Sequence, residues 1–135
     1  MQVKDLDGNI SNWQLLGGIS HGTIKNKSSL HLDARELLHK CFPTLQILEE
    51  IPIQVRRSET LYLDFYIPLT KKCVEVHGEQ HFEYNQFFHK SMLGFVKHKK
   101  RDKDKKEWCE LNGLTLIELC YNNKSEWENI IKNEH

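Results

Sequence analysis

The sequence predicts an α/β (α+β) domain in which a mixed central sheet is flanked by helices. Segments with helical and strand periodicity occur in the order helix, three strands, helix, strand, helix. Two of these strands are joined by the short turn "LTKK", which makes them an antiparallel hairpin. The 135 residues, 39% apolar and 28% charged, are typical of one soluble domain with one core.

The first helix is expected to run from Ser28 or Ser29, either of which can cap its N-terminus, to about Cys41. Its apolar residues have helical spacing and predict an inward stripe. They are Leu30, Ala34, Leu37, Leu38 and Cys41.

Three strands are expected next, over residues 45–55, 60–68 and 73–78. The first reads either as one strand or as a strand bent at Pro52. A long helix over residues 91–113 follows, and Asn112-Gly113 closes it. A strand over residues 114–122 and a short helix over 125–133 complete the predicted order.

We expect a single domain over residues 1–135, with residues 1–27 as an extension and 28–135 as the core. The extension has the turn signal "DGN" between two short apolar runs, which predicts a hairpin. No apolar run reaches the ~20 residues of a membrane span, and the first residues lack the apolar segment of a signal peptide. We therefore expect a cytoplasmic protein that does not contact a membrane. The four cysteines form no C-x-x-C pair and are expected to be small buried apolar residues.

The net charge of zero conceals a segregation of charge along the chain. The block "KHKKRDKDKK" at residues 97–106 has seven Lys/Arg and two Asp, a local net charge of +5. Such a block suits a polyanion such as nucleic acid, although a solvated helix face would have the same composition.

Asp64 interrupts an otherwise strong strand, where Asp is disfavoured. Glu75 and His77 occupy alternate positions of the neighbouring strand, so Asp64 and Glu75 can converge. Two carboxylates at short range suit Mg²⁺, and a metal beside a phosphate-binding block suggests phosphodiester hydrolysis. The alternative is that Asp64 is an exposed or salt-bridged strand residue.

His81 is a candidate proton-transfer group, because Gly78 allows the chain to turn back towards the strand end. Asp102 lies on the inward stripe of the long helix and can fix the tautomer of His81; a salt bridge to a nearby Lys or Arg is the alternative. A zinc site at His77 and His81 is disfavoured, because Gly78 stands where the H-E-x-x-H motif has Glu.

Together these motifs resemble the very-short-patch repair (Vsr-like) endonucleases and the EDxHD homing endonucleases of the PD-(D/E)xK nuclease superfamily. The resemblance is carried by "LDFYIP", "CVEVHGEQHF" and "KRDKDKKEWCELNGLTLIEL", in that order, over roughly residues 61–121. It implies the PD-(D/E)xK restriction-endonuclease-like fold. His77 stands where that fold usually has Lys, which puts the number of metal ions in doubt and leaves His77 without a firm role.

The resemblance implies a role for each candidate residue. Asp64 would be the main metal ligand, with Glu75 or the main-chain carbonyl of Val76 beside it. His81 would activate water, Asp102 would orient His81, and Glu36 would support the site. His77 and Gln80 complete the catalytic candidates, and the DNA-binding candidates are Lys97, Lys99, Lys100, Arg101, Lys103, Lys105 and Lys106.

The resemblance therefore implies a nuclease domain that hydrolyses DNA with Mg²⁺, for which Mn²⁺ can substitute, in a bacterial or phage-infected cell. An added DNA-binding domain, a partner protein and a homodimer remain open as additions. The N-terminal hairpin would be a DNA-contacting or dimerising element, or an extension of the sheet. The alternative function is a non-catalytic nucleic-acid-binding module on a nuclease-like fold.

Overall fold

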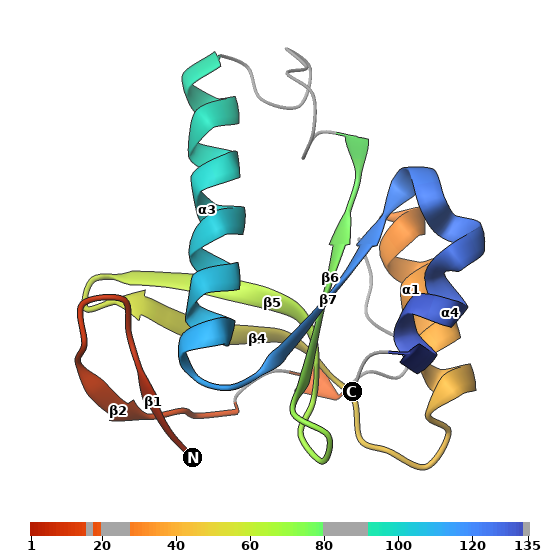
Figure 1. Ribbon diagram of the computed structural model, residues 1–135, viewed down its shortest axis with the longest axis horizontal. Helices are drawn as coiled ribbons and strands as arrows, with labels where there is room; N and C mark the ends of the chain where they lie inside the picture. The colour runs from red at the N-terminus through yellow and green to blue at the C-terminus, as the bar shows by residue number, and fades with distance from the viewer. Residues whose placement is uncertain (16–17, 20–27, 80–91, 134–135) are drawn as a thin grey trace.

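The computed structural model describes residues 1–15, 18–19, 28–79 and 92–133 and confirms a mixed α+β fold (Figure 1). A five-stranded sheet has helices on both faces, and a two-stranded sheet lies beside it. The strands are β1 (Gln2–Lys4), β2 (Ile10–Asn12), β3 (Gly18–Ile19), β4 (Leu48–Arg56), β5 (Glu59–Ile67), β6 (Lys72–His77) and β7 (Thr115–Cys120). The helices are α1 (Ser29–Cys41), α3 (Met92–Leu111), the 3₁₀ segment η2 (Tyr121–Glu126) and α4 (Trp127–Asn133).

The main sheet has the order β3-β4-β5-β6-β7. All neighbours are antiparallel except β6 and β7, which are parallel and lie on either side of α3 in the sequence. The sheet is therefore mixed, as the sequence predicts. β4 continues through Pro52 as one strand, and its pairing with β5 shifts between Gln54 and Arg56 instead.

Helices α1 and α4 cover one face of the sheet. Ser28 is the N-cap of α1, and its side chain accepts a hydrogen bond from the His31 backbone N–H. Ala34 and Leu38 are fully buried against sheet residues such as Phe65. The buried side of α1 also includes His31 and Arg35, while Leu30, Leu37 and Cys41 are only partly buried. The inward stripe is thus centred nearer to His31 and Arg35 than the apolar residues alone predict.

Helix α3 packs on the opposite face. Trp108 and Cys109 are buried there, and Trp108 meets Trp13 edge-on with 5.1 Å between ring centroids. Gly113 has a φ of +68°, the left-handed conformation that ends a helix, as Asn112-Gly113 predicts. Among the described segments no helix is both long and apolar enough to cross a membrane.

The predicted N-terminal hairpin exists as β1 and β2, which form a separate two-stranded sheet. The hairpin itself does not extend the main sheet, but β3, from the same N-terminal extension, pairs with β4 and does. The Asn112 side chain accepts a hydrogen bond from Lys4 N at 2.7 Å and donates one to Lys4 O at 3.0 Å. Trp13 donates from its indole to Pro52 O at 2.9 Å. The hairpin is therefore bound both to the end of α3 and to β4.

All four cysteines are free thiols. Cys73 and Cys109 are buried, which confirms their predicted role as small apolar residues, whereas Cys41 and Cys120 are partly exposed.

Asp104 is the buried acid of α3, with 3% of its surface exposed. Its carboxylate accepts a hydrogen bond from Arg56 Nη1 at 2.8 Å, and Lys100 Nζ lies 3.8 Å away. A buried carboxylate requires a partner, and Arg56 provides it here. The contact therefore joins α3 to the end of β4.

We predict that Asp104→Ala lowers the free energy of unfolding by about 1–3 kcal/mol, because Arg56 loses its buried acceptor. Urea denaturation measures this difference. Glu107→Ala is the control, since Glu107 pairs with Lys103 on the exposed surface of the same helix; it should change stability by less than about 0.5 kcal/mol. Equal effects of the two changes would contradict a structural role for the Arg56–Asp104 contact.

Candidate active site

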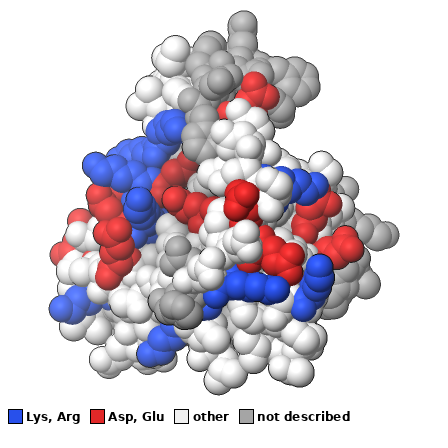
Figure 2. Space-filling model, turned by 45° about the vertical axis from the view of Figure 1, so that its right-hand side comes forward, with Lys and Arg blue, Asp and Glu red and all other residues white. Residues whose placement is uncertain are grey.

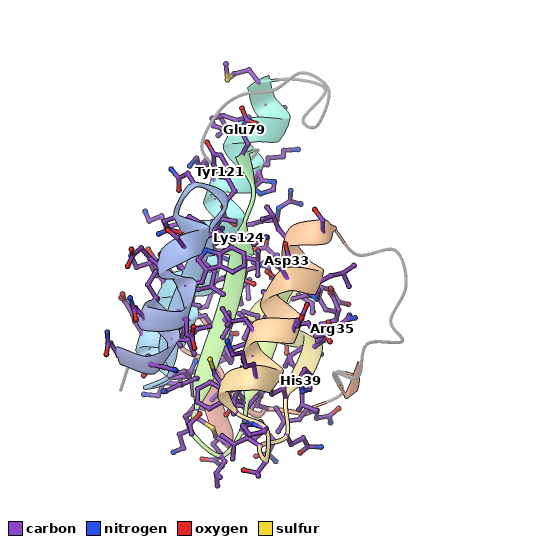
Figure 3. The ribbon with its side chains drawn as sticks, turned by 90° about the vertical axis from the view of Figure 1, so that its right-hand side faces the viewer. Asp33, Arg35, His39, Glu79, Tyr121 and Lys124 are labelled. Carbon is purple, nitrogen blue, oxygen red and sulfur yellow. The ribbon has the colours of Figure 1, made fainter. Side chains whose placement is uncertain are left out.

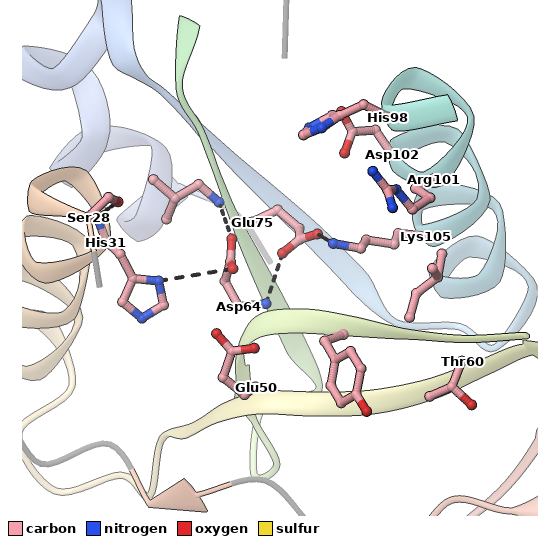
Figure 4. A pocket seen from close by; sticks show the side chains of 13 residues that line it. Ser28, His31, Glu50, Thr60, Asp64, Glu75, His98, Arg101, Asp102 and Lys105 are labelled. Atoms are coloured by element: carbon pink, nitrogen blue, oxygen red, sulfur yellow. Dashed lines mark hydrogen bonds and ion pairs between the residues drawn. The ribbon is translucent and has the colours of Figure 1, made fainter. Parts of the chain in front are cut away.

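The candidate site forms where β6 separates from β5. The backbone pairing of these strands covers Ile67↔Lys72, Tyr66↔Cys73 and Phe65↔Val74 and ends there. Beyond it, Asp64 N donates to Glu75 Oε2 and Val76 N donates to Asp64 Oδ2, both at 2.8 Å. The two carboxylates thus take over backbone hydrogen bonds at the fork between the strands (Figure 4). The predicted convergence of Asp64 and Glu75 is confirmed.

Lys105 of α3 reaches this carboxylate pair. Its Nζ lies 2.7 Å from Glu75 Oε1, and only 18% of its side chain is exposed. Burial lowers the pKa of Lys105, but the charge of Glu75, the hydrogen bond to it and the charge of Asp64 outweigh burial and raise the pKa. The ammonium is therefore protonated at neutral pH. Lys105 was predicted as a DNA-binding residue on the inward stripe of the helix; the structure places it in the pocket, beside Glu75.

Asp64 keeps its proton to an unusually high pH. Burial, the charge of Glu75 and the hydrogen bond with Glu75 raise the pKa of Asp64 from 3.8 to about 7. The Val76 N–H and the charge of Lys105 oppose this rise but do not cancel it. Two carboxylates at a strand fork therefore repel each other at neutral pH, which favours binding of a further cation.

A pocket of about 580 Å³ opens over the pair. From α3 it is lined by His98, Arg101, Asp102 and Lys105, which confirms that the predicted stripe faces inward. The Oδ2 atom of Asp102 lies 4.0 Å from His98 Nε2, and 20% of the Asp102 side chain is exposed. Of the two acids, Asp102 lines the pocket and Asp104 is buried.

The opposite wall of the pocket contains a buried network that the sequence pattern did not predict. His31 Nε2 lies 2.6 Å from Glu49 Oε1, and Arg35 binds the same carboxylate through Nε at 2.8 Å and Nη2 at 3.0 Å. His31 Nδ1 points towards the pocket and lies 4.0 Å from Asp64 Oδ1. The signal was present in the helical spacing, because residues 31 and 35 flank Ala34 at the positions of an inward stripe.

Glu50 is a further pocket residue that the sequence pattern did not predict. Its φ is +55°, which is uncommon for a residue with a side chain. The backbone pairing of β4 with β5 covers Glu49↔Phe65 and Ile51↔Leu63 but not Glu50 and Asp64 between them. The unusual conformation thus occurs opposite Asp64, at the pocket wall.

Other candidates lie elsewhere in the structure. Glu36 is exposed on α1 and lines a separate pocket with Asp33, Lys40 and Lys124, so the structure does not bring it to Asp64. Asp33 and Lys124 form an ion pair there (Figure 3). His77 is buried, with its Nε2 3.4 Å from Glu118 Oε1 on β7, and is not among the residues that line the main pocket. That hydrogen bond lowers the pKa of Glu118.

Gln80 and His81 lie outside the described residues, and so does the predicted pairing of His81 with Asp102. Val76 lines the pocket, and its N–H is the donor to Asp64 described above.

The remaining basic residues of α3 are exposed: Lys97, Lys99, Lys100, Arg101, Lys103 and Lys106. Two are paired within the helix, Lys100 with Asp104 and Lys103 with Glu107. Basic side chains form a patch bordered by acidic ones (Figure 2). The predicted basic helix face therefore exists beside the pocket.

Within the described ranges no three His, Cys, Asp or Glu side chains are grouped so as to enclose a metal ion. Mg²⁺ does not need such a cage, because it is commonly held by one or two carboxylates and keeps several water molecules. Asp64 and Glu75 fit that requirement.

Comparison with known proteins identifies two viral relatives. The chain is 36% identical over 64 residues to "Uncharacterized protein 033L" of Invertebrate iridescent virus 3. The matched segment covers 47% of this chain and 33% of that protein. The chain is 39% identical over 61 residues to "Uncharacterized protein 307L" of Invertebrate iridescent virus 6. This segment covers 45% of this chain and 31% of that protein. The matched segments thus span about a third of each relative. No family model and no solved structure matches the chain.

We predict that Asp64→Asn stabilises the protein at pH 8 and has little effect at pH 5. Because folding raises this pKa, the unfolded chain binds fewer protons than the native one between about pH 4 and 7, and the free energy of unfolding falls as pH rises. Asparagine removes this cost and still accepts the Val76 hydrogen bond. The expected gain at pH 8 is about 1–3 kcal/mol, measured by chemical denaturation at both pH values. A loss of stability at pH 8 would contradict the raised pKa.

Proposed function

We propose that the protein is a metal-dependent endonuclease that hydrolyses phosphodiester bonds in DNA, on a PD-(D/E)xK-like fold related to the Vsr-like and EDxHD enzymes. One observation carries the proposal: Asp64 and Glu75 converge at the fork of two strands, in a pocket that also contains Lys105 and Arg101. Two carboxylates can hold a divalent cation, and two basic side chains can bind the phosphate beside it.

Asp64 and Glu75 would hold Mg²⁺ or Mn²⁺, with the Val76 carbonyl as a further oxygen ligand. The bound ion would polarise the phosphate and offset its charge. The raised pKa of Asp64 supports this role, since excess negative charge at the fork is what a cation relieves. Lys105 and Arg101 would stabilise the negative charge that grows on the phosphate oxygens during hydrolysis.

The exposed basic face of α3 supports DNA as the partner. Arg101 lines the pocket and belongs to this face, so a backbone phosphate in the pocket leaves neighbouring phosphates close to the lysines. By the resemblance, His81 would activate water, and Asp102 would orient the His81 ring.

A second candidate is a non-catalytic nucleic-acid-binding module. The 2.7 Å contact between Lys105 and Glu75 favours it, because the ammonium already neutralises one of the two carboxylates. The two candidates differ in one measurable property, cleavage that requires a divalent cation.

The first test incubates the parent protein with supercoiled plasmid and Mg²⁺ or Mn²⁺, beside Asp64→Asn and the control Glu110→Gln, an exposed acid of α3. We expect metal-dependent nicking or linearisation by the parent and the control, and at least a 100-fold loss in Asp64→Asn. Binding without cleavage of plasmid, nicked, mismatched or branched DNA would support the non-catalytic module. Equal cleavage by Asp64→Asn would place the chemistry elsewhere.

The basic face gives an independent prediction for binding. Replacing Lys97 and Lys106 by Ala should weaken DNA binding similarly for unrelated sequences and reduce the slope of log K against log salt by roughly 1 per residue. Fluorescence anisotropy between low and moderate salt measures both effects. Lys132→Ala on α4, where Lys132 pairs with Glu128, is the control and should leave the slope unchanged. An unchanged slope in the double variant would exclude this face.

A further inference from the structure

The buried network on the α1 side of the pocket has no role in the function proposed so far. We propose that His31 is a further catalytic residue, a proton acceptor for the attacking water, and that Glu49 and Arg35 are positioning residues that orient it. This inference rests on the proposed nuclease function.

The tautomer of His31 follows from its partners. Glu49 accepts two hydrogen bonds from Arg35 and is fully buried, so it is an ionised carboxylate that can only accept. The 2.6 Å contact therefore requires that His31 Nε2 has the hydrogen and donates it to Glu49. In the neutral ring, Nδ1 is then the acceptor.

The ring is also fixed in orientation. It stacks on Phe65, with 4.5 Å between centroids and 24° between planes, and only 7% of the side chain is exposed. Turning the ring over would break the hydrogen bond to Glu49 and leave a buried donor unsatisfied. These contacts hold Nδ1 towards Asp64.

The distance from Nδ1 to Asp64 Oδ1 is 4.0 Å, which is too long for a direct hydrogen bond. A water molecule placed beside both atoms can be within hydrogen-bond distance of each. This position is beside the carboxylate that would hold the metal and inside the pocket that would receive the phosphate. The geometry thus defines a place for the attacking water.

In the proposed step the water oxygen bonds to phosphorus and one of its protons passes to His31 Nδ1. The bond from phosphorus to the bridging 3′ oxygen breaks, and that oxygen keeps the electron pair and takes a proton from solvent. The products are a 3′-hydroxyl and a 5′-phosphate. No oxidant or reductant is needed.

Other pocket groups fit this role less well. Lys105 is protonated and bound to Glu75. His98 is on the opposite wall, on α3, and its Nε2 lies 4.0 Å from Asp102 Oδ2.

The decisive variant is His31→Gln. The glutamine amide nitrogen takes the place of Nε2 and can still donate to Glu49, but no acceptor remains at the place of Nδ1. Glu49 also keeps both bonds from Arg35, so the fold has no new unpaired charge. His39→Gln, the same change about two turns along α1, is the matched control. His81→Ala tests the other candidate for water activation.

We expect His31→Gln to cleave plasmid at least roughly 100-fold more slowly than the parent, the scale of general-base catalysis, with an unchanged melting temperature and Mn²⁺ affinity by calorimetry. His39→Gln should cleave normally. In the parent without metal, ¹⁵N NMR of the imidazoles should show His31 protonated at Nε2 and unprotonated at Nδ1.

Four results would overturn the inference. Normal cleavage by His31→Gln would do so while leaving the nuclease function intact. Loss of Mn²⁺ binding in that variant would make His31 a metal ligand instead. A proton on Nδ1 in the NMR spectrum would remove the acceptor. A parent protein that cleaves no DNA would remove the proposed function, and this inference with it.

Discussion

The exchange of hydrogen bonds between Asp64 and Glu75 is the constraint on which the site depends. Strand β6 leaves β5 after Val74, while its other edge continues to pair with β7 up to His77. The fork would leave the backbone N–H groups of Asp64 and Val76 without strand partners, and the two carboxylates satisfy them. The same bonds hold the carboxylates in place, so the topology of the sheet and the geometry of the site have a single cause.

Concentrating negative charge at the fork has a cost that the surrounding elements offset. Lys105 comes from α3, on the side of the sheet where Trp108 packs, and reaches Glu75. On the other side, α1 and β4 contribute a separate charged group, in which Arg35 neutralises Glu49 and Glu49 holds His31. The pocket thus lies between a cationic wall and a wall with a fixed imidazole. Each wall depends on a helix packed against its own face of the sheet.

The sequence predicted those parts of the fold that follow from local pattern. The helix after Ser28, the hairpin of β5 and β6 and the closure of α3 at Gly113 all have strong local signals and are confirmed. Asp64 was identifiable because an acid in an apolar strand needs a compensating partner, and Glu75 was the acid on the adjoining strand.

The residues that the sequence did not reveal are charged groups buried by tertiary contacts. Lys105 occurs in a run of lysines; helical spacing places it on the inward stripe, but only the position of Glu75 shows that its charge is paired there. Glu49 and Arg35 are buried because they meet each other across α1 and β4, 14 residues apart. Glu36 illustrates the opposite error, since the resemblance implied a site acid on α1 but the helix turns Glu36 outward. On α1 it is His31 that faces the site instead.

The attachment of the first hairpin has a consequence for the order of events during synthesis. Lys4 bonds to Asn112 across 108 positions of sequence, and Trp13 packs against Trp108. The hairpin therefore cannot complete its contacts until Trp108 and Asn112 have been synthesised. Closing so long a loop is slow relative to local helix and hairpin formation. The N-terminal hairpin should accordingly be the last element to dock, and its docking would mark the completion of the fold.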